Sequence, residues 1–369
     1  MIESLRATPL PHVARRLLVP GTALLLAVAC GRVPTGGPPP GPPDSSFQAL
    51  VAGAPDPQGN ATTTRFDSAT RRALAMPAPG NATAARFSGA DRISYLLADS
   101  IQSQDVRGGA ERVEAASRSL LMAVYAWSSR GVLAYLAQPP EAGTGRASEL
   151  VIQRPGRPAV TVSLALGGRT LTADPPQLRF SPDGSLLMLF HPFGAGSAQA
   201  TLQVRRLDGR LVFGPSGAGV PSDATWGLNG KLYFRDARGV NVADVSSGGP
   251  ARTILPGVRW YRPDTAPDGR TIVFEVHDAG LPRFELLDTA TDTVVPGFAR
   301  AGAAFARFVS PTEIWFHPVA PCAPCGGTPA VRGEIVSLDT ARLTEHATGL
   351  TGYLTDVRPG PAQRAQGSP

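Results

Sequence analysis

The chain has 369 residues, of which 41 are glycine and 37 are proline, and its formal net charge at pH 7 is +6. This composition is unusual for a helical protein and typical of many short strands joined by turns. The charge surplus is small for the length, and no run alternates basic with aromatic residues, so nucleic acid is not expected as a partner. The sequence also lacks a Walker loop and a dinucleotide fingerprint, and we expect no cofactor.

Residues 1–29 have the pattern of an export signal. Arginines precede an apolar stretch, residues 17–28, which is too short and too interrupted to remain as a membrane-spanning helix. Cys30 follows the small residues at its end, which resembles the cleavage site of bacterial lipoproteins and predicts lipid attachment at Cys30. Ala27 departs from the leucine usual in that family, and an ordinary signal peptidase would cut the same bond.

Residues 30–44 follow as a segment rich in proline and glycine, with no apolar face to bury. Such a composition predicts an extended, semi-stiff tether. Together with the signal, it predicts an exported protein anchored by lipid to the bacterial cell envelope, at the outer membrane and facing the periplasm.

Residues 45–118 form an N-terminal segment with the least regular pattern. Its clearest part is R-I-S-Y-L-L-A-D at residues 92–99, which reads as a strand similar to that at residues 131–138. The two stretches lie 39 residues apart.

The element that organises the rest of the chain is a hairpin at residues 178–191. Its turn contains Ser181, Pro182, Asp183 and Gly184. Proline presets the φ of the second turn position, aspartate can bond its own backbone, and glycine accepts a positive φ. The apolar run after the turn is too short for a buried helix, so a core strand is predicted.

This hairpin recurs through residues 119–361. The residues that precede the successive turns, termed anchors below, are Trp127, Phe180, Trp226, Thr265, Phe308 and Val357. Neighbouring anchors are 39 to 53 residues apart. A period in the forties, with two visible strands and room for two more, is typical of the four-stranded blades of a β-propeller. The sequence therefore predicts an all-β propeller whose blades stack on one another.

The S-P-D-G turn after an aromatic residue, at this spacing, resembles the repeats of TolB-type and related WD-like propellers. Pro267, Asp268 and Gly269 make a second copy, with Ala266 in place of the serine. The resemblance covers about residues 119–360 and implies a fold rather than a chemistry. TolB proteins have an additional α/β domain and no lipid anchor, and residues 44–118 show no βαβ pattern, so TolB's partners are not transferred to this chain.

The ends of the repeat region predict how the ring closes. The last repeat supplies an inner strand near Val357, and residues 92–99 supply a strand that can follow it. We expect these N- and C-terminal segments to share a closing blade, which gives six blades. Seven is the alternative if Phe87 begins a blade of its own, and residues 362–369 are expected to be a disordered tail.

A second group of candidate residues contains cysteines and histidines. Cys322 and Cys325 form a C-x-x-C pair in an insertion, and in an exported protein a structural disulfide is the expected role, with redox exchange or metal binding as alternatives. His191, His277 and His317 each follow an apolar strand at equivalent repeat positions. We expect them on one polar rim, too far apart to bind one ion at ~2 Å.

No catalytic constellation is identifiable in the sequence, which lacks both a nucleophile elbow and an H-E-x-x-H helix. The expected function, by analogy of fold, is a non-enzymatic envelope scaffold that binds a protein or other ligand. The alternative is a propeller enzyme or small-molecule binder, similar to lactonases or quinoproteins, that uses the axial pocket. Convergent polar side chains along the channel favour the alternative, and small or apolar ones favour the scaffold.

Overall fold

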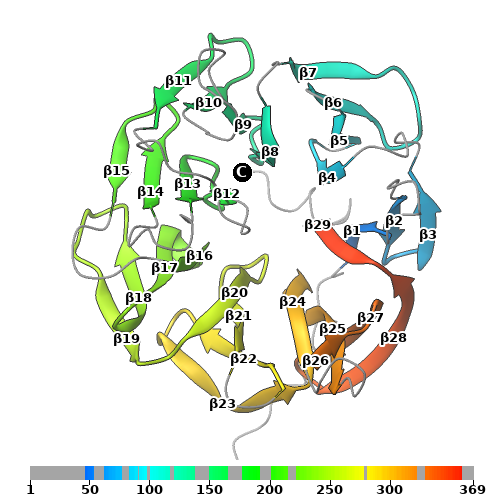
Figure 1. The fold of residues 1–369 in the computed structure, drawn as a ribbon, viewed down its shortest axis with the longest axis vertical. Helices are drawn as coiled ribbons and strands as arrows, with labels where there is room; N and C mark the ends of the chain where they lie inside the picture. The colour runs from blue at the N-terminus through cyan, green and yellow to red at the C-terminus, as the bar shows by residue number, and fades with distance from the viewer. Residues whose placement is uncertain are drawn as a thin grey trace, which may run out of the picture. The chain divides into compact units, whose positions relative to one another are not determined.

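The chain folds into a series of antiparallel sheets, in agreement with the repeated hairpins of the sequence. The computed structural model describes residues 46–53, 62–76, 83–89, 91–97, 100–116, 120–137, 149–164, 177–191, 201–214, 222–277, 281–321 and 329–359. These residues form seven sheets, six with four strands and one with five, arranged as blades around an axis (Figure 1). Among them, no helix is long and apolar enough to cross a membrane.

Each blade runs outward from the axis in strand order. The closing blade contains β29 (Tyr353–Pro359), β1 (Phe47–Ala52), β2 (Thr63–Asp67) and β3 (Arg72–Ala75). The next two contain β4 (Thr83–Phe87), β5 (Arg92–Leu97), β6 (Ser100–Asp105) and β7 (Arg112–Ala116), then β8 (Leu120–Trp127), β9 (Leu133–Ala137), β10 (Glu149–Gln153) and β11 (Val160–Ser163). The fourth contains β12 (Gln177–Phe180), β13 (Leu186–His191), β14 (Thr201–Arg206) and β15 (Leu211–Phe213).

The remaining three blades follow the same order. The fifth contains β16 (Ser222–Trp226), the 3₁₀ turn η1 (Leu228–Gly230), β17 (Lys231–Asp236), β18 (Gly239–Asp244) and β19 (Arg252–Pro256). The sixth contains β20 (Trp260–Thr265), β21 (Thr271–Val276), β22 (Arg283–Asp288) and β23 (Thr293–Ala301). The seventh contains β24 (Ala303–Ser310), β25 (Glu313–Pro321), β27 (Glu334–Asp339) and β28 (Thr344–Thr351), with β26 (Pro329–Val331) paired to the end of β25.

The hydrophobic core is divided among the interfaces between blades. The described residues contain seven clusters of buried apolar side chains, and each cluster joins two neighbouring blades. One cluster, for example, contains Leu136 and Leu150 of one blade and Leu187 of the next. Full burial of one such side chain is worth about 1.5–3 kcal/mol, so the stability of each blade depends on both of its neighbours.

The prediction that the two ends of the chain share the closing blade is confirmed, but the predicted partner strand and the count of six are wrong. Among the described residues β29 pairs with β1, from Phe47 opposite Pro359 to Ala52 opposite Tyr353. The stretch beginning at Arg92 is β5, and it pairs with β4 of its own blade, which ends at Phe87. The seven-bladed alternative, in which Phe87 begins a separate blade, is therefore correct.

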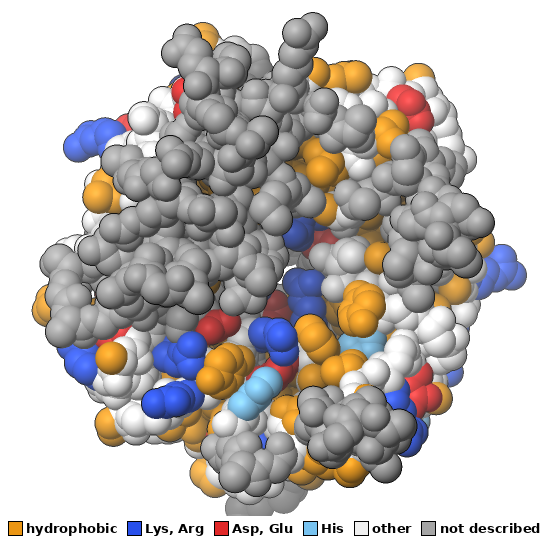
Figure 2. Space-filling view, viewed as in Figure 1, with side chains coloured by type: hydrophobic (Ala, Val, Ile, Leu, Met, Phe, Trp, Pro, Cys, Tyr) orange, Lys and Arg blue, Asp and Glu red, His pale blue; other side chains and the backbone are white. Residues whose placement is uncertain are grey.

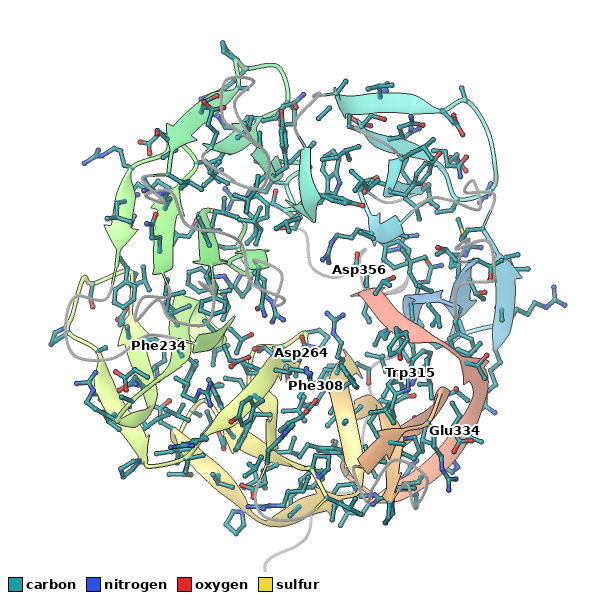
Figure 3. The ribbon with its side chains drawn as sticks, viewed as in Figure 1. Phe234, Asp264, Phe308, Trp315, Glu334 and Asp356 are labelled. Carbon is teal, nitrogen blue, oxygen red and sulfur yellow. The ribbon has the colours of Figure 1, made fainter. Side chains whose placement is uncertain are left out.

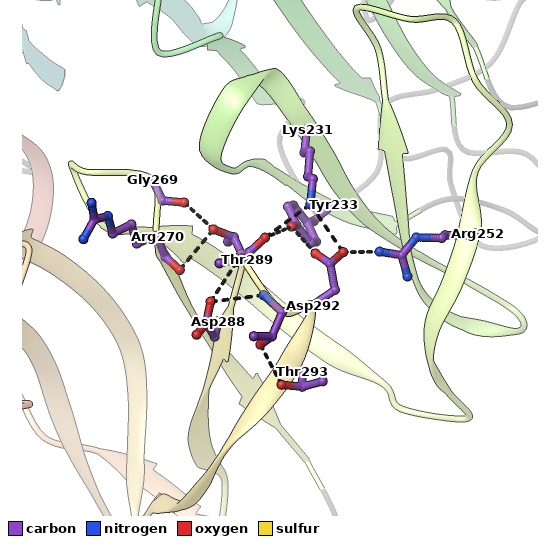
Figure 4. Close-up of polar contacts among 11 residues, drawn as sticks. Lys231, Tyr233, Arg252, Gly269, Arg270, Asp288, Thr289, Asp292 and Thr293 are labelled. Carbon is purple, nitrogen blue, oxygen red and sulfur yellow. Dashed lines mark hydrogen bonds and ion pairs between the residues drawn. The ribbon is translucent and has the colours of Figure 1, made fainter.

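An ionic cluster around one buried carboxylate joins the fifth blade to the sixth (Figure 4). Asp292, in the turn between β22 and β23, accepts a hydrogen bond from Tyr233 and forms ion pairs with Lys231 and Arg252. The Asp292 side chain is 5% exposed. Burial, together with the hydrogen bond to Asp292, raises the pKa of Tyr233. The cluster therefore fixes one blade against the next through a single carboxylate.

Candidate functional site

Each inner strand has one residue at the same register of its pairing with the second strand of the blade. These residues, termed the inner ring, immediately precede the blade anchors and Phe87: Arg86, Ala126, Arg179, Thr225, Asp264, Arg307 and Asp356. Each is paired with an equivalent position of the second strand of its blade. Figure 3 shows Asp264 of β20 and Asp356 of β29 at the inner edge of the ring, beside its centre. Five of the seven inner-ring residues are therefore charged, and two of them lie beside the centre of the ring.

The two aspartates of the inner ring tie neighbouring inner strands together. Asp264 accepts a hydrogen bond from the Phe308 N–H at 3.0 Å, and Asp356 accepts one from the Phe87 N–H at 2.7 Å. In both cases the donor lies on the inner strand of the following blade. Burial raises the pKa of Asp356, although the charge of Arg86 opposes this rise. Both carboxylates therefore have a structural role at the axis.

The arginines of the inner ring extend across several blades. Arg179 of β12 donates to the Thr225 hydroxyl at 3.2 Å and lies 3.7 Å from an Asp264 oxygen. Arg307 of β24 lies 3.8 Å from the same carboxylate and donates to the Leu354 carbonyl. About a third of each arginine side chain, 31%, is accessible to solvent. These guanidinium groups are therefore deep in the ring and still open to the channel.

Four of the inner strands contain a residue with a left-handed backbone conformation, two positions before the inner-ring residue. Three positions before Phe87 or an anchor, φ is 52° at Ala84, 47° at Asp223, 47° at Arg262 and 56° at Phe305. Each of these residues falls at a shift in strand register. A left-handed conformation is costly for side chains such as those of Arg262 and Phe305, on the order of 1–3 kcal/mol each, and such outliers are concentrated at functional sites.

The bulges of β20 and β24 place a group of aromatic and charged side chains together. This group, termed the axial cluster, contains Tyr261, Arg262, Glu275, His277, Phe305 and Tyr353, which are linked by ring contacts, ion pairs and hydrogen bonds. In the space-filling view, basic, acidic, histidine and hydrophobic side chains border the centre of the face turned toward the viewer (Figure 2).

Buried Glu275 holds the axial cluster in place. One of its oxygens lies 3.1 Å from the Arg262 guanidinium and 3.0 Å from the His277 ring, and the other accepts the Phe305 N–H. Arg262 lies over the Phe305 ring at 4.2 Å, and Tyr261 packs on His277 at 4.6 Å. The two oxygens of Glu275 thus contact three neighbouring groups and position them.

His317 is buried beneath this cluster, which corrects the prediction that the three histidines share a polar rim. His317 is 2% exposed, whereas the side chain of His277 is 41% exposed. The His317 ring lies near Phe305 and Tyr353, and its Nδ1 donates to the Arg332 carbonyl at 3.0 Å. The side chain of His191 lies outside the described residues. In the described part of the chain, no three metal-ligating side chains gather.

The environment of His317 predicts a loss of stability in acid. Burial lowers the pKa of His317 below 6.5, and hydrogen bonds to the backbone oppose this only in part. Between pH 6.5 and the folded-state pKa the unfolded chain binds more protons, so the free energy of unfolding falls as the pH falls through this window. His317→Asn, which keeps a donor for the Arg332 carbonyl, is expected to flatten this dependence in urea unfolding between pH 7 and 5. His346→Asn, at an exposed position of β28, should leave the slope unchanged, and equal slopes for both variants would contradict the assignment.

The repeat-turn residues lie at the other end of the inner strands. Ser181 donates to Asp183 at 2.6 Å, and Gly184 has a φ of 68° in the turn between β12 and β13. Pro267, Asp268 and Gly269 occupy the corresponding turn after β20, in which Asp268 accepts the Arg270 N–H at 3.0 Å. These residues shape turns and do not contribute to the axial cluster. The other predicted site residues, Cys30, Cys322 and Cys325, lie outside the described residues.

Comparison with known proteins supports the fold. No protein-family model matches the chain, and no curated protein is detectably similar to it in sequence. A structure from a study of two prolyl endopeptidases matches with a TM-score of 0.56 at 11% identity, over 84% of this chain and 50% of that chain. The chain has the β-propeller fold.

Two further solved structures are similar. A putative 6-phosphogluconolactonase from Bacteroides fragilis has a TM-score of 0.50 at 13% identity, with 86% of this chain and 99% of that chain covered. TolB from Acinetobacter baumannii has a TM-score of 0.43 at 15% identity, with 70% and 66% covered. The chain thus spans half the length of the peptidase structure and 66% of TolB. At such identities the similarity concerns the fold and not the activity.

Proposed function

We propose that this chain is an exported, lipid-anchored scaffold of the bacterial cell envelope, which binds a protein or other ligand at its axial cluster without catalysing a reaction. The observation that carries the proposal is the exposure of aromatic and cationic groups on one rigid platform. Tyr353 is 52% exposed, and the side chains of Arg262 and His277 are 49% and 41% exposed. Aromatic and arginine side chains dominate the energetics of protein interfaces.

The platform is held before any ligand arrives. Glu275 fixes Arg262 and the backbone at Phe305, and Asp223 accepts the Arg262 N–H at 3.2 Å. A preorganised surface loses less conformational entropy on binding. The backbone strain at Arg262 and Phe305 is therefore consistent with a surface maintained for recognition.

The envelope location rests on residues 1–29 and on Cys30. If Cys30 carries the whole anchor, Cys30→Ser should move the protein from the membrane fraction to the soluble periplasmic fraction. An intact mass of the mature protein without acyl groups would contradict the lipid anchor. It would not affect the proposed binding site.

The binding site is tested by affinity capture from detergent-solubilised envelopes. The amount of partner captured by the wild-type chain should fall several-fold with Tyr353→Ala, because alanine removes an exposed aromatic contact of the axial cluster. The control, Leu211→Ala, removes a side chain that is 56% exposed on the outer strand β15, and it should retain the partner. Equal retention by the two variants would place recognition elsewhere on the ring.

One observation also favours the alternative of a small-molecule ligand. Five of the seven inner-ring residues are arginine or aspartate, and convergent polar side chains are the feature that favours use of the axial pocket. The charge of these side chains restricts which ligands can enter.

A further inference from the structure

The inner ring has more positive than negative groups. It contains Arg86, Arg179 and Arg307 against Asp264 and Asp356. The five residues occupy the same register on different inner strands, and Arg179 and Arg307 reach the same Asp264 oxygen. The positive excess is therefore a property of the channel itself.

The two carboxylates neutralise these arginines only in part. Asp264 is shared between Arg179 and Arg307, at 3.7 and 3.8 Å, while its other oxygen accepts the Phe308 N–H. These separations are longer than the 2.7–2.9 Å of a charge-assisted hydrogen bond. Within the described part of the chain, the Nη1 group of Arg179 also donates to Thr225 and the Pro263 carbonyl, and that of Arg307 to the Leu354 and Thr355 carbonyls. Since each guanidinium carries five N–H groups, these neutral acceptors and one shared carboxylate do not use all of its donors.

Arg86 has an unmet donor. Its Nε is buried and has no hydrogen-bond partner within the part of the chain that the structure describes. Its guanidinium lies 5.8 Å from the centre of the Tyr125 ring. A buried N–H without an acceptor is energetically unfavourable, so an acceptor that reached this position would be bound favourably.

The three arginines also influence one another. Burial lowers the pKa of Arg179; Asp264 opposes this effect, and the charges of Arg307 and Arg86 lower the pKa further. Like charges held together in the ring favour the binding of an anion between them. Solvent access to 31% of Arg179 and of Arg307 provides a way for that anion to arrive.

We propose that Arg86, Arg179 and Arg307 form a binding site for a small oxyanion, a carboxylate or phosphate group carried by the ligand. The planar guanidinium matches both groups because it offers two parallel N–H donors to two oxygens. This inference names the chemistry of the ligand and so rests on the proposed function, but it uses residues other than those of the axial cluster.

The test measures anion binding to the full-length, detergent-solubilised protein. Sodium succinate and sodium phosphate are titrated by calorimetry at an ionic strength held constant with sodium chloride, because chloride controls for screening. Binding of either anion above the chloride background is expected. A preference for succinate assigns the site to carboxylates, and a preference for phosphate assigns it to phosphate groups.

Variants connect this binding to the inner ring. Arg86→Gln should raise the dissociation constant about tenfold or more, since it removes one charged donor group. Arg157→Gln, in the exposed turn between β10 and β11, should leave it unchanged. If Arg86→Gln does not fold, Arg86→Lys keeps the charge without the fork and should bind several-fold more weakly than wild type.

Two results would overturn the site. One is the absence of succinate and phosphate binding above chloride, and the other is unchanged affinity in the folded Arg86 variant. Envelope capture through Tyr353 would be unaffected by either result, so the proposed function can stand when this inference fails.

Discussion

Deletion of residues 353–369 is expected to abolish cooperative unfolding of the propeller. The deletion removes β29, the innermost strand of the closing blade, and leaves β1, from Phe47 to Ala52, paired only with β2. It also removes Leu354 and Val357, which pack against the cluster that contains Phe47 and Trp315. On the other side of the blade it removes Arg358, which lies over the Phe87 ring at 4.1 Å. Several side chains worth about 1.5–3 kcal/mol each would lose burial, against a typical total stability of 5–15 kcal/mol.

The matched deletion begins after the last described strand. Removing residues 362–369 should leave a single melting transition close to that of the full chain, because β29 and its ladder remain. Thermal unfolding followed by circular dichroism and by calorimetry compares the two. Similar melting of both truncated chains would show that β29 does not close the ring.

The second large effect is expected for Asp292→Asn. Asparagine keeps the shape of Asp292 and tolerates its left-handed φ of 57°, so the substitution isolates the charge. The amide group would face Lys231 and Arg252, which are also donors, and Tyr233 would keep an acceptor of reduced strength. Breaking a buried ion pair costs about 3–5 kcal/mol, and the partial exposure of Lys231 and Arg252 reduces the expected loss to about 2–4 kcal/mol.

Urea unfolding measures this loss of unfolding free energy, and an exposed ion pair provides the control. Glu345 pairs with Arg300 at the outer edge, and both side chains are more than a third exposed. Glu345→Gln should therefore cost less than about 1 kcal/mol. Comparable losses for Asp292→Asn and Glu345→Gln would mean that the cluster does not hold the fifth and sixth blades together.

The propeller fold was predictable because each blade repeats a local turn. Phe180 and the turn from Ser181 to Gly184 need only neighbouring residues to form, so their pattern survives in the sequence. The predicted number of blades was wrong because the turn pattern is weak near the N-terminus of the ring. Phe87 precedes a turn without proline. The strands β1 and β29 pair although about 300 residues separate them, so no hairpin turn connects them directly. Pairing over such a distance leaves no local pattern to read.

The site was predictable only in part. Alternation along a strand places Arg179 and Arg307 on the face opposite to their anchors, so the inner ring can be read from the sequence once the anchors are aligned. The left-handed conformation of Arg262 and Phe305 could not be predicted, because neither residue type favours it and the stabilising acceptors belong to the preceding blade. His317 was placed on a rim because its burial depends on Phe305 and Tyr353, which come from other strands.

The most direct measurement for the proposed function is site-specific photocrosslinking in intact cells. A benzophenone amino acid replaces Tyr353 in one strain and Leu211 in another, since both positions are more than half exposed and only Tyr353 belongs to the axial cluster. The proposed function predicts a discrete crosslinked envelope component from position 353 and none from position 211. A crosslinked component from position 211, with none from position 353, would contradict it.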